Sequence, residues 1–445
     1  MIRLLGGLLL LLQITWGGPG FAATPVQDER LIIVSFADRG INAAPAGAPG
    51  DFYTPGPVGV AGGYATTAWS RRLTRRLARD YQLELVTDWP IQSLGVHCAV
   101  FRVGGTGPIE DMMRRLGEDA RVDGVQRLNT FRVLGAHREA PGAGLGALEL
   151  DAAHRLSTGR NVRVAVVDTG IDVHHPDLAG QIVEMKDLVS DAQGDHDDVH
   201  GTAVAGIIAA LADNQQGIVG VAPGAKLMSL RACWPQGPAD PGAVCNSLTL
   251  ARALDVVTRL KPDVLNLSLA GPADPLLNAL LAAVLDAGVV VVAAAPAEDG
   301  EGVAFPTADE RVIRVETTGA GGTGYRAVRA PGQDVLTTFP HGGYDFISGS
   351  SFAAAHVSGV VALLLEMHPG MPATEVRELL LDSSQDFQRT VPAGERQGGA
   401  PRRGLRAAND EPTCALMTHL GHGAVCAQPD APPLRRAPLV REQAS

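Results

Sequence analysis

The sequence predicts an α/β protein in which a large, doubly wound, mostly parallel sheet is preceded by a small α+β unit. The chain has 445 residues, and because a single hydrophobic core rarely grows beyond about 250–300 residues, two folded units are expected. Residues 162–295 contain short apolar runs without polar alternation, as in strands buried on both faces of a parallel sheet. Residues 31–133 show a different pattern, in which strands alternate with amphipathic helices.

The overall composition is that of a folded protein rather than a polyanion-binding one. Hydrophobic residues make up 45% of the chain and charged residues 19%, which is ordinary for globular proteins and argues against global disorder. The formal net charge is −11, so the chain has no long-range attraction for phosphate backbones. Nucleic acid is therefore not an expected partner.

Residues 1–22 have the pattern of an export signal. Arg3 supplies a positive start, Leu4 to Ile14 an apolar stretch, and Gly20-Phe21-Ala22 a small-residue cleavage site. The alternative is a membrane anchor, but the apolar stretch is shorter than the roughly 20 residues that span a bilayer. We therefore predict a protein exported to the periplasm or the extracellular space, with no stable membrane anchor.

Residues 27–133 are predicted to form a small unit with the order βαββαβ. Apolar residues repeat at i, i+4, i+8 from Trp69 and at i, i+3, i+4, i+7 from Ile109, which gives each of two helices one apolar face. The expected strands are Leu31 to Phe36, Leu83 to Val86, Val96 to Val103 and Val122 to Val133. This order is that of a ferredoxin-like unit.

A Gly/Ala/Pro-rich link at residues 134–146 separates this unit from the main domain, placed at 147–410. The main domain's expected strands are Val162 to Val167, Lys226 to Leu230, Val264 to Leu269 and Val289 to Ala295. Helical segments between them imply a doubly wound sheet with right-handed crossovers, in which sites form at the carboxyl ends of the strands. Residues 411–445, rich in Pro, Ala and Arg, are expected to be a C-terminal extension.

The five cysteines divide into Cys98 and two pairs with the same spacing. Cys233 and Cys245 are twelve positions apart, as are Cys414 and Cys426. Export permits disulfides, and closing a loop of this size contributes about 3 kcal/mol in the chain-entropy model. We predict these two bridges; the alternative is free buried thiols.

Three segments carry residues that suit nucleophilic catalysis: Val164 to Asp172, which contains Asp168; His200 to Gly206; and Gly349 to Val357, which contains Ser351. A serine hydroxyl attacks a carbonyl poorly unless an imidazole removes its proton, and a carboxylate fixes the tautomer of that imidazole. A serine at a helix start also directs its own N–H toward a developing oxyanion.

These segments resemble the subtilase family (peptidase S8), in which Asp, His and Ser follow one another in this order. The resemblance implies a subtilisin-like fold and a catalytic triad of Asp168, His200 and Ser351. It implies a serine endopeptidase that hydrolyses peptide bonds through an acyl-enzyme on Ser351, with peptides or proteins as substrates.

The resemblance extends beyond the triad. Ser268-Leu269-Ala270-Gly271 resembles the family's substrate-lining segment, whose strand edge pairs with an extended peptide. Residues 27–133 resemble the propeptide, an intramolecular chaperone and inhibitor. The resemblance thus implies an autoinhibited precursor that is cut within residues 134–146.

One departure from the family concerns the oxyanion region, which comprises Ala297 and the backbone of Ser351. The family has a Gly-Asn pair where this chain has Pro296-Ala297, and that asparagine is the family's side-chain oxyanion donor. One alternative is therefore a weak or inactive subtilase that acts as a peptide-binding module. A second, an α/β-hydrolase esterase, is disfavoured because it requires Ser before Asp and His and a G-x-S-x-G elbow.

No cofactor or metal is expected. Two segments, His174 to Asp177 and Asp195 to Asp198, contain ligand-type side chains without convincing ligand spacing, and we interpret both as solvated loops. Calcium is common in the subtilase family, and a structural calcium ion stays open because no ligand loop is recognisable.

Overall fold

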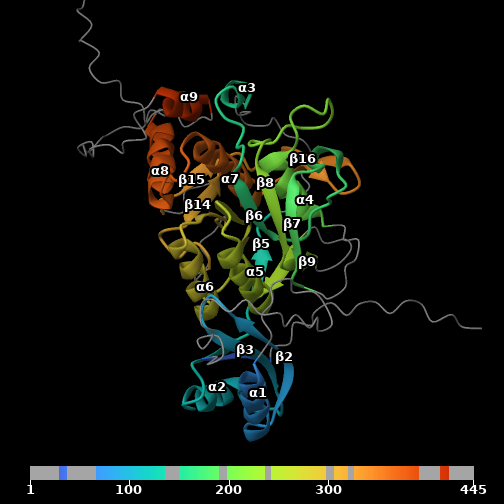
Figure 1. Ribbon diagram of the computed structural model, residues 1–445, viewed down its shortest axis with the longest axis vertical. Coiled ribbons are helices and arrows are strands. Elements are labelled where there is room, and N and C mark those ends of the chain that lie inside the picture. The colour runs from blue at the N-terminus through green and yellow to red at the C-terminus, as the bar shows by residue number, and fades with distance from the viewer. Residues whose placement is uncertain are drawn as a thin grey trace, which may run out of the picture.

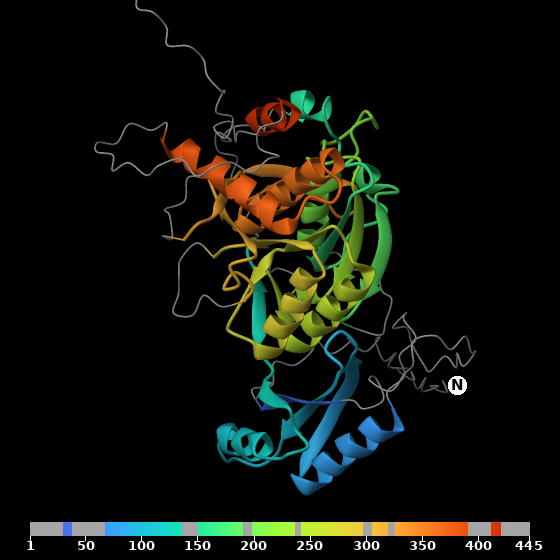
Figure 2. The ribbon, with the colours of Figure 1, turned by 60° about the vertical axis from the view of Figure 1, so that its left-hand side comes forward.

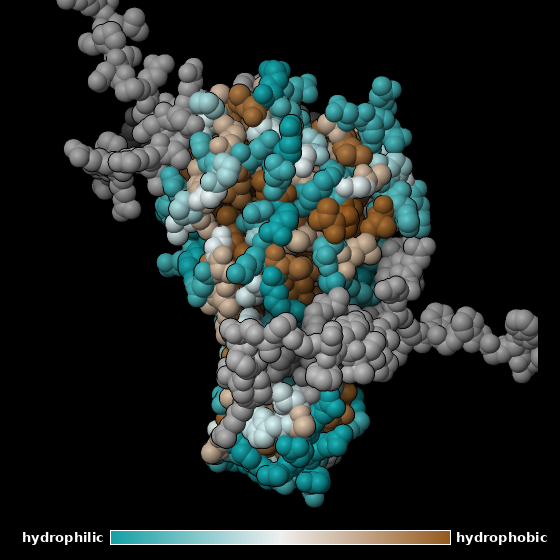
Figure 3. Space-filling model, viewed as in Figure 1, coloured by the Kyte–Doolittle hydropathy of each residue, from teal (hydrophilic) through white to brown (hydrophobic). Residues whose placement is uncertain are grey.

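The computed structural model describes residues 30–37, 67–135, 150–189, 198–235, 242–296, 305–318, 325–389 and 411–419. Figure 1 shows the small N-terminal unit, in blue, at the lower end of the molecule and the large α/β unit above it. Figure 3 shows a mostly hydrophilic lower end, where five arginines of the first helix (residues 71, 72, 75, 76 and 79) lie exposed.

The small unit is an antiparallel sheet covered on one face by two helices. Its elements are β1 (Leu31–Ala37), α1 (Ala68–Asp80), β2 (Leu83–Ile91), β3 (Val96–Val103), α2 (Ile109–Gly117) and β4 (Gly124–Arg127). The strand order β2-β3-β1-β4 confirms the ferredoxin-like prediction. Leu77 of α1 and Leu116 of α2 pack against Phe36 and Phe101 of the sheet.

The single strand expected at Val122 to Val133 is wrong, because the structure has two strands in different sheets. After β4 the chain turns at Asn129, whose N–H donates to Ser247 Oγ (2.9 Å) and whose Nδ2 donates to Asp274 (3.0 Å). β5 (Thr130–Val133) then enters a second sheet with the order β12-β5-β10-β9. Its partners all belong to the large unit: β9 (Cys233–Pro235), β10 (Ala243–Asn246) and β12 (Leu269–Ala270).

The large unit confirms the predicted doubly wound sheet. Seven strands pair in parallel in the order β15-β14-β13-β11-β6-β8-β7. They are β6 (Arg163–Asp168), β7 (Ile182–Asp187), β8 (Lys226–Arg231), β11 (Val264–Leu267), β13 (Val290–Ala294), β14 (Ile313–Thr317) and β15 (Val328–Ala330). Along β6, Val164 and Val166 face one core, and Ala165 and Val167 face the other.

Helices cover both faces of this sheet. One core holds α4 (Val199–Ala209), α7 (Ser350–Met367), α8 (Ala373–Arg389), α3 (Leu150–His154) and α9 (Glu411–His419). The other holds α5 (Ser247–Leu260) and α6 (Pro275–Asp286), which lie next to the small unit (Figure 2). A short 3-10 helix, η1 (Pro176–Leu178), and the antiparallel pair β16 (Val335–Phe339) and β17 (Gly343–Ile347) complete the described elements.

Among the described helices, α7 alone has the length and hydropathy of a membrane span. Its apolar window is 72% buried inside the protein, and its residues Phe352 to Leu364 belong to the central core. The hydropathy of α7 therefore reflects its position between other elements of the large unit.

The cysteines follow the predicted pairing where the structure describes them. Cys233 and Cys245 form a disulfide between β9 and β10. Cys414 on α9 is also disulfide-bonded, and its predicted partner, Cys426, lies outside the described residues. Cys98 is a free thiol whose pKa is raised by burial, so it is protonated and poorly reactive.

Candidate active site

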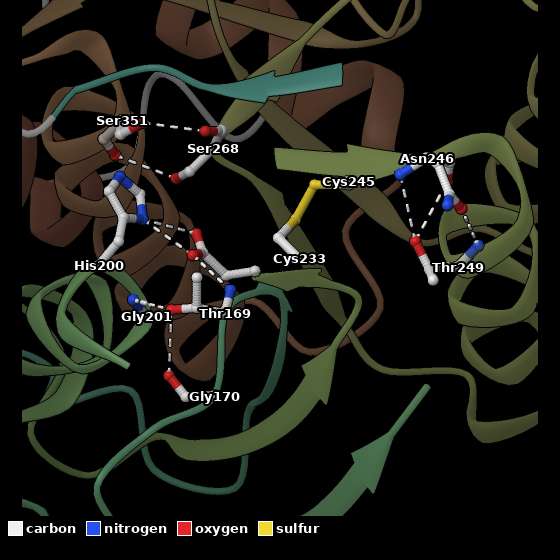
Figure 4. Close-up of a disulfide and its surroundings, with 11 residues drawn as sticks. Thr169, Gly170, His200, Gly201, Cys233, Cys245, Asn246, Thr249, Ser268 and Ser351 are labelled. Atoms are coloured by element: carbon white, nitrogen blue, oxygen red, sulfur yellow. Dashed lines mark hydrogen bonds and ion pairs between the residues drawn. A yellow bond between two sulfur atoms is a disulfide. The ribbon is translucent and has the colours of Figure 1, made fainter. Parts of the chain in front are cut away.

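The three predicted triad residues meet at one edge of the parallel sheet. Asp168 is the last residue of β6, His200 is the second residue of α4, and Ser351 is the second residue of α7. All three side chains are buried, and Figure 4 shows Ser351 and His200 side by side. Strand ends and helix starts come together here because consecutive parallel strands present the same edge.

Asp168 and His200 form a direct hydrogen-bonded pair. His200 Nδ1 lies 2.8 Å and 2.9 Å from the two carboxylate oxygens of Asp168, and the Thr169 N–H donates to the same carboxylate (2.7 Å). Because a carboxylate accepts, Nδ1 carries the proton and Nε2 presents a lone pair. Nε2 has no hydrogen-bond partner among the residues that the structure describes, so it is available as a base.

Ser351 lies beside this pair but its hydroxyl points elsewhere. Ser351 Oγ donates to the Ser268 carbonyl oxygen at 2.9 Å, as Figure 4 shows, and not to His200. Attack by Ser351 thus requires its hydroxyl to rotate about χ1 toward Nε2 of His200. The ring of Phe352, 5.2 Å from that of His200 between centroids, packs against the imidazole.

A second histidine, His356, lies on α7 five residues after Ser351. Burial lowers the pKa of His356 to about 4, and its Nδ1 lies 2.8 Å from the Phe352 carbonyl oxygen. His356 is therefore neutral near pH 7, with Nδ1 as the donor. Its hydrogen-bond partners are the backbones of Phe352 and Pro331, which makes it a structural residue.

The end of the small unit occupies the site as an extended peptide. The Leu134 N–H donates to the Ser268 carbonyl oxygen (3.0 Å), and the Ser351 N–H donates to the Leu134 carbonyl oxygen (2.9 Å). The Leu134 carbonyl thus faces the N-terminus of α7, where aligned peptide dipoles favour negative charge. The Ser351 N–H therefore occupies the place of a donor to the oxygen of a bound peptide carbonyl.

Of the predicted substrate-binding residues, three contact this peptide through their backbones. Ser268 supplies its carbonyl oxygen, while Leu269 pairs with Val133 and Ala270 pairs with Arg132. Gly271 differs because its backbone pairs with Phe305 (N···O 3.1 Å and 3.2 Å). Gly271 instead makes room: a Cβ atom there would lie 2.2 Å from the Phe131 ring.

Gly349 is required by the close approach of the bound peptide. Its φ of +151° favours glycine, and a Cβ atom would lie 2.5 Å from Gly135 Cα and 2.8 Å from the Leu134 oxygen. The glycine two residues before Ser351 therefore allows the Leu134–Gly135 peptide to reach the serine.

Two parts of the cleft, strand β10 and the buried ring of Phe131, were not predicted from the sequence. β10 pairs with the other edge of β5, with Cys245 opposite Phe131 and Val244 opposite Arg132. Phe131 itself is fully buried and packs edge-on against Phe305 at 5.5 Å between ring centroids. The alternation of Phe131 and Val133 was a signal for a half-buried strand, but nothing local indicated which sheet it joins.

The interpretation of His174 to Asp177 as a solvated loop is wrong, because His175 and Asp177 are fully buried. The Asp177 carboxylate accepts hydrogen bonds from Asn214 Nδ2 (2.6 Å) and the Ile218 N–H (2.9 Å). Burial and a further hydrogen bond to Asp177 raise the pKa of Tyr344 to about 12. Calcium takes oxygen ligands, so a carboxylate surrounded by N–H and O–H donors does not fit that ion.

Asp198, the described residue of the second candidate metal segment, is also buried rather than solvated. Its Oδ2 accepts a hydrogen bond from Arg231 Nε at 3.2 Å, so it is part of an ion pair between α4 and β8. Residues 195–197 of that segment lie outside the described residues, as does Ala297 of the predicted oxyanion region.

Comparison with known proteins identifies the class. Residues 159–402 match the subtilase family (peptidase S8), which is more than half of the chain, and the chain therefore belongs to this family. It is 32% identical over 270 residues to an intracellular serine protease of Paenibacillus polymyxa, covering 56% of this chain and 80% of that protein. It is 33% identical over 255 residues to subtilisin E of Bacillus subtilis (strain 168), covering 53% and 64%.

A solved structure shows the same fold. Fervidolysin from Fervidobacterium pennivorans, a keratinolytic enzyme related to subtilisin, has a TM-score of 0.59 and 24% sequence identity. The match covers 79% of this chain and 57% of that chain. At this identity the likeness supports the subtilisin-like fold and no more.

Proposed function

We propose that this subtilase is a serine endopeptidase made as an autoinhibited precursor. The observation that carries the proposal is the Leu134 carbonyl, which accepts a hydrogen bond from the Ser351 N–H. A carbonyl in this position is both the first substrate and, after cleavage, the end of an inhibitor.

The proposed reaction cuts the Leu134–Gly135 bond. His200 Nε2 takes the proton of the rotated Ser351 hydroxyl as Oγ attacks the Leu134 carbonyl carbon, and the Ser351 N–H stabilises the resulting oxyanion. His200 then gives this proton to the Gly135 nitrogen, the C–N bond breaks, and a Leu134 acyl-enzyme remains. A water molecule, deprotonated by His200, hydrolyses the ester and releases Ser351. Asp168 is a positioning residue that holds His200 Nδ1–H and stabilises the imidazolium.

The small unit is proposed to be the inhibitory prodomain, because its contacts with the large unit extend far beyond Leu134. The Ser93 N–H and hydroxyl both donate to Asp255 on α5 (3.1 Å and 2.9 Å). Gln126 Nε2 donates to Asp274 at the start of α6 (2.7 Å). Ile33 and Val100 of the small sheet also share a core with α5 and α6, so the prodomain stays bound once the chain is cut.

The proposal is tested by incubating the purified precursor and then treating separate samples with a serine-directed phosphonate, with casein and with a simple ester. An endopeptidase is labelled on Ser351, hydrolyses casein and acquires a new N-terminus at Gly135. A peptide-binding module is neither labelled nor active, and an esterase hydrolyses the ester while sparing casein. Either of these last two results refutes the proposal.

Phe131→Ala is expected to weaken the hold of the prodomain on the processed enzyme. Phe131 is a fully buried aromatic anchor, and truncating such an anchor typically costs about 2–4 kcal/mol, or about 30- to 1,000-fold in dissociation constant. Proteolytic activity should then appear earlier after cleavage. Arg132→Ala, which truncates an exposed neighbour on the same strand, is the control. It should change the time between cleavage and the appearance of activity little.

Export is also a proposal. The buried Cys233–Cys245 disulfide suits an oxidising compartment, whereas one of the similar proteins is named an intracellular serine protease. Residues 1–22 lie outside the described residues. We expect the Ser351→Ala precursor to be found outside the cytoplasm with Ala23 as its first residue; a cytoplasmic chain that retains residues 1–22 would contradict export.

A further inference from the structure

The peptide in the cleft is bound by two different strand edges. β12 pairs with Val133 and Arg132, next to the reacting carbonyl of Leu134. β10 pairs with Arg132, Phe131 and Thr130. When Leu134 is counted as the first residue before the Leu134–Gly135 bond, these are the third, fourth and fifth. β12 therefore contacts the residues next to the reacting carbonyl, and β10 contacts residues farther upstream.

The two edges also differ in how they are supported. β12 follows directly on β11, a central strand of the seven-stranded sheet. β10 pairs with the peptide and with β9, in the order β12-β5-β10-β9, and continues directly into α5, whose N-cap is Asn246. When the peptide leaves, β10 keeps β9 as its strand partner.

The Cys233–Cys245 disulfide adds a covalent link between β10 and β9. Cys245 and Cys233 are opposite each other in the β10–β9 pairing, and Cys245 is also opposite Phe131 of the peptide. Cys233 comes two residues after β8, and the intervening Ala232 N–H donates to the Asp168 carbonyl oxygen at 2.9 Å. The crosslink thus ties β10 to the part of the main sheet that carries Asp168. Both cysteines are fully buried.

We propose that the Cys233–Cys245 disulfide determines substrate selection by holding β10 at pairing distance from the peptide. Reduction of this disulfide weakens the binding of long substrates and leaves the acylation of short ones intact. This inference rests on the proposed endopeptidase function and adds to it the disulfide on which the binding of long substrates depends.

The processed enzyme tests the inference with two substrates. One is a peptide with the sequence Thr-Phe-Arg-Val-Leu before the cleaved bond, and the other is an acyl-leucine ester that fills only the position of Leu134. In Cys233→Ala/Cys245→Ala, KM for the peptide is expected to rise about tenfold, the effect of losing one to two hydrogen bonds. KM for the ester, and kcat for both substrates, should stay within about twofold of wild type. An equal rise in KM for both substrates, or no rise for the peptide, overturns the inference.

Reduction provides the matched controls. Dithiothreitol should raise KM for the peptide in wild type and in Cys414→Ala, which lacks the disulfide of α9, and reoxidation should reverse the rise. The same treatment should leave Cys233→Ala/Cys245→Ala unchanged. A reductant effect that persists in this double variant, or that vanishes in Cys414→Ala, assigns the effect to another cysteine and overturns the inference.

A readout without catalysis separates this inference from the proposed function. In the uncut Ser351→Ala precursor, hydrogen exchange at residues 130–132 is expected to accelerate when the disulfide is removed. The Leu134 amide, which donates to Ser268, should keep its protection. Unchanged exchange at residues 130–132 contradicts the role of the disulfide even if the enzyme is active. If the exchange pattern is as expected but the wild-type enzyme hydrolyses no substrate, the endopeptidase proposal fails while the role of the disulfide in the cleft stands.

Discussion

Ser351→Ala is expected to leave the chain uncut between Leu134 and Gly135 and to lower kcat by about 10⁶, the loss measured when the serine of a subtilisin is removed. The reason is that Ser351 carries the hydroxyl beside His200, and its N–H already donates to the Leu134 carbonyl oxygen. Intact mass and N-terminal sequencing measure the cleavage, and casein hydrolysis measures kcat. Ser350→Ala, which changes the neighbouring serine, is the control and should still be cut.

The triad residues act as a unit, which gives this prediction a second check. Adding His200→Ala to Ser351→Ala should cost almost nothing further, because the imidazole has no proton to accept once the hydroxyl is gone. A second large loss in the double variant would mean that His200 has another task. If wild type and Ser351→Ala both began at Gly135, a different protease would have made the cut.

The parts of the fold that are determined locally could be predicted from the sequence. The buried strands β6, β8, β11 and β13 are continuous apolar runs, which short windows detect. The triad could be placed because each residue sits at a strand end or helix start that its own flanking residues define. The three motifs and their resemblance to the family named the residues, and the structure places Asp168 and His200 within hydrogen-bond distance.

The parts that depend on distant pairing could not be predicted. β5 has a strand pattern, but Asn129 hydrogen bonds with Ser247 and Asp274, more than a hundred residues away, move it out of the first sheet. β10 is only four residues long and becomes a binding edge only when β5 lies beside it. The twelve-residue cysteine spacing indicated a bridge, but not that the bridge lies opposite Phe131.

Burial of polar residues was the second source of error. His175 and Asp177 have the composition of a solvated turn, and their burial depends on Asn214, Ile218 and Gly343, which come from later loops. A buried carboxylate is stable only when donors satisfy it. The donors around Asp177 are the Asn214 amide, the Ile218 N–H and the Tyr344 hydroxyl, all from later segments, so their presence could not be inferred from the segment itself.

The double substitution Pro296→Gly/Ala297→Asn is expected to raise kcat by about 10²–10³, the factor lost when the oxyanion asparagine of a subtilisin is removed. The described part of the site offers the Ser351 N–H to the Leu134 carbonyl oxygen, and the resemblance to the family implies that its second donor, an asparagine side chain, would stand at the position of Ala297. Pro296 is changed as well, because its fixed φ restricts the direction in which the chain continues. We expect the wild type to be a slow enzyme for the same reason.

The measurement is steady-state hydrolysis of one peptide by wild type, Ala297→Asn, the double variant and Ser351→Ala. A donor that acts only on the oxyanion raises kcat and leaves KM nearly unchanged. Ala297→Asn alone should gain less than the double variant, since Pro296 still constrains the backbone. A lower KM at constant kcat would show that the new side chain binds substrate instead of the oxyanion. If wild type and the double variant are both no faster than Ser351→Ala, the endopeptidase proposal fails and the cleft is that of a peptide-binding module.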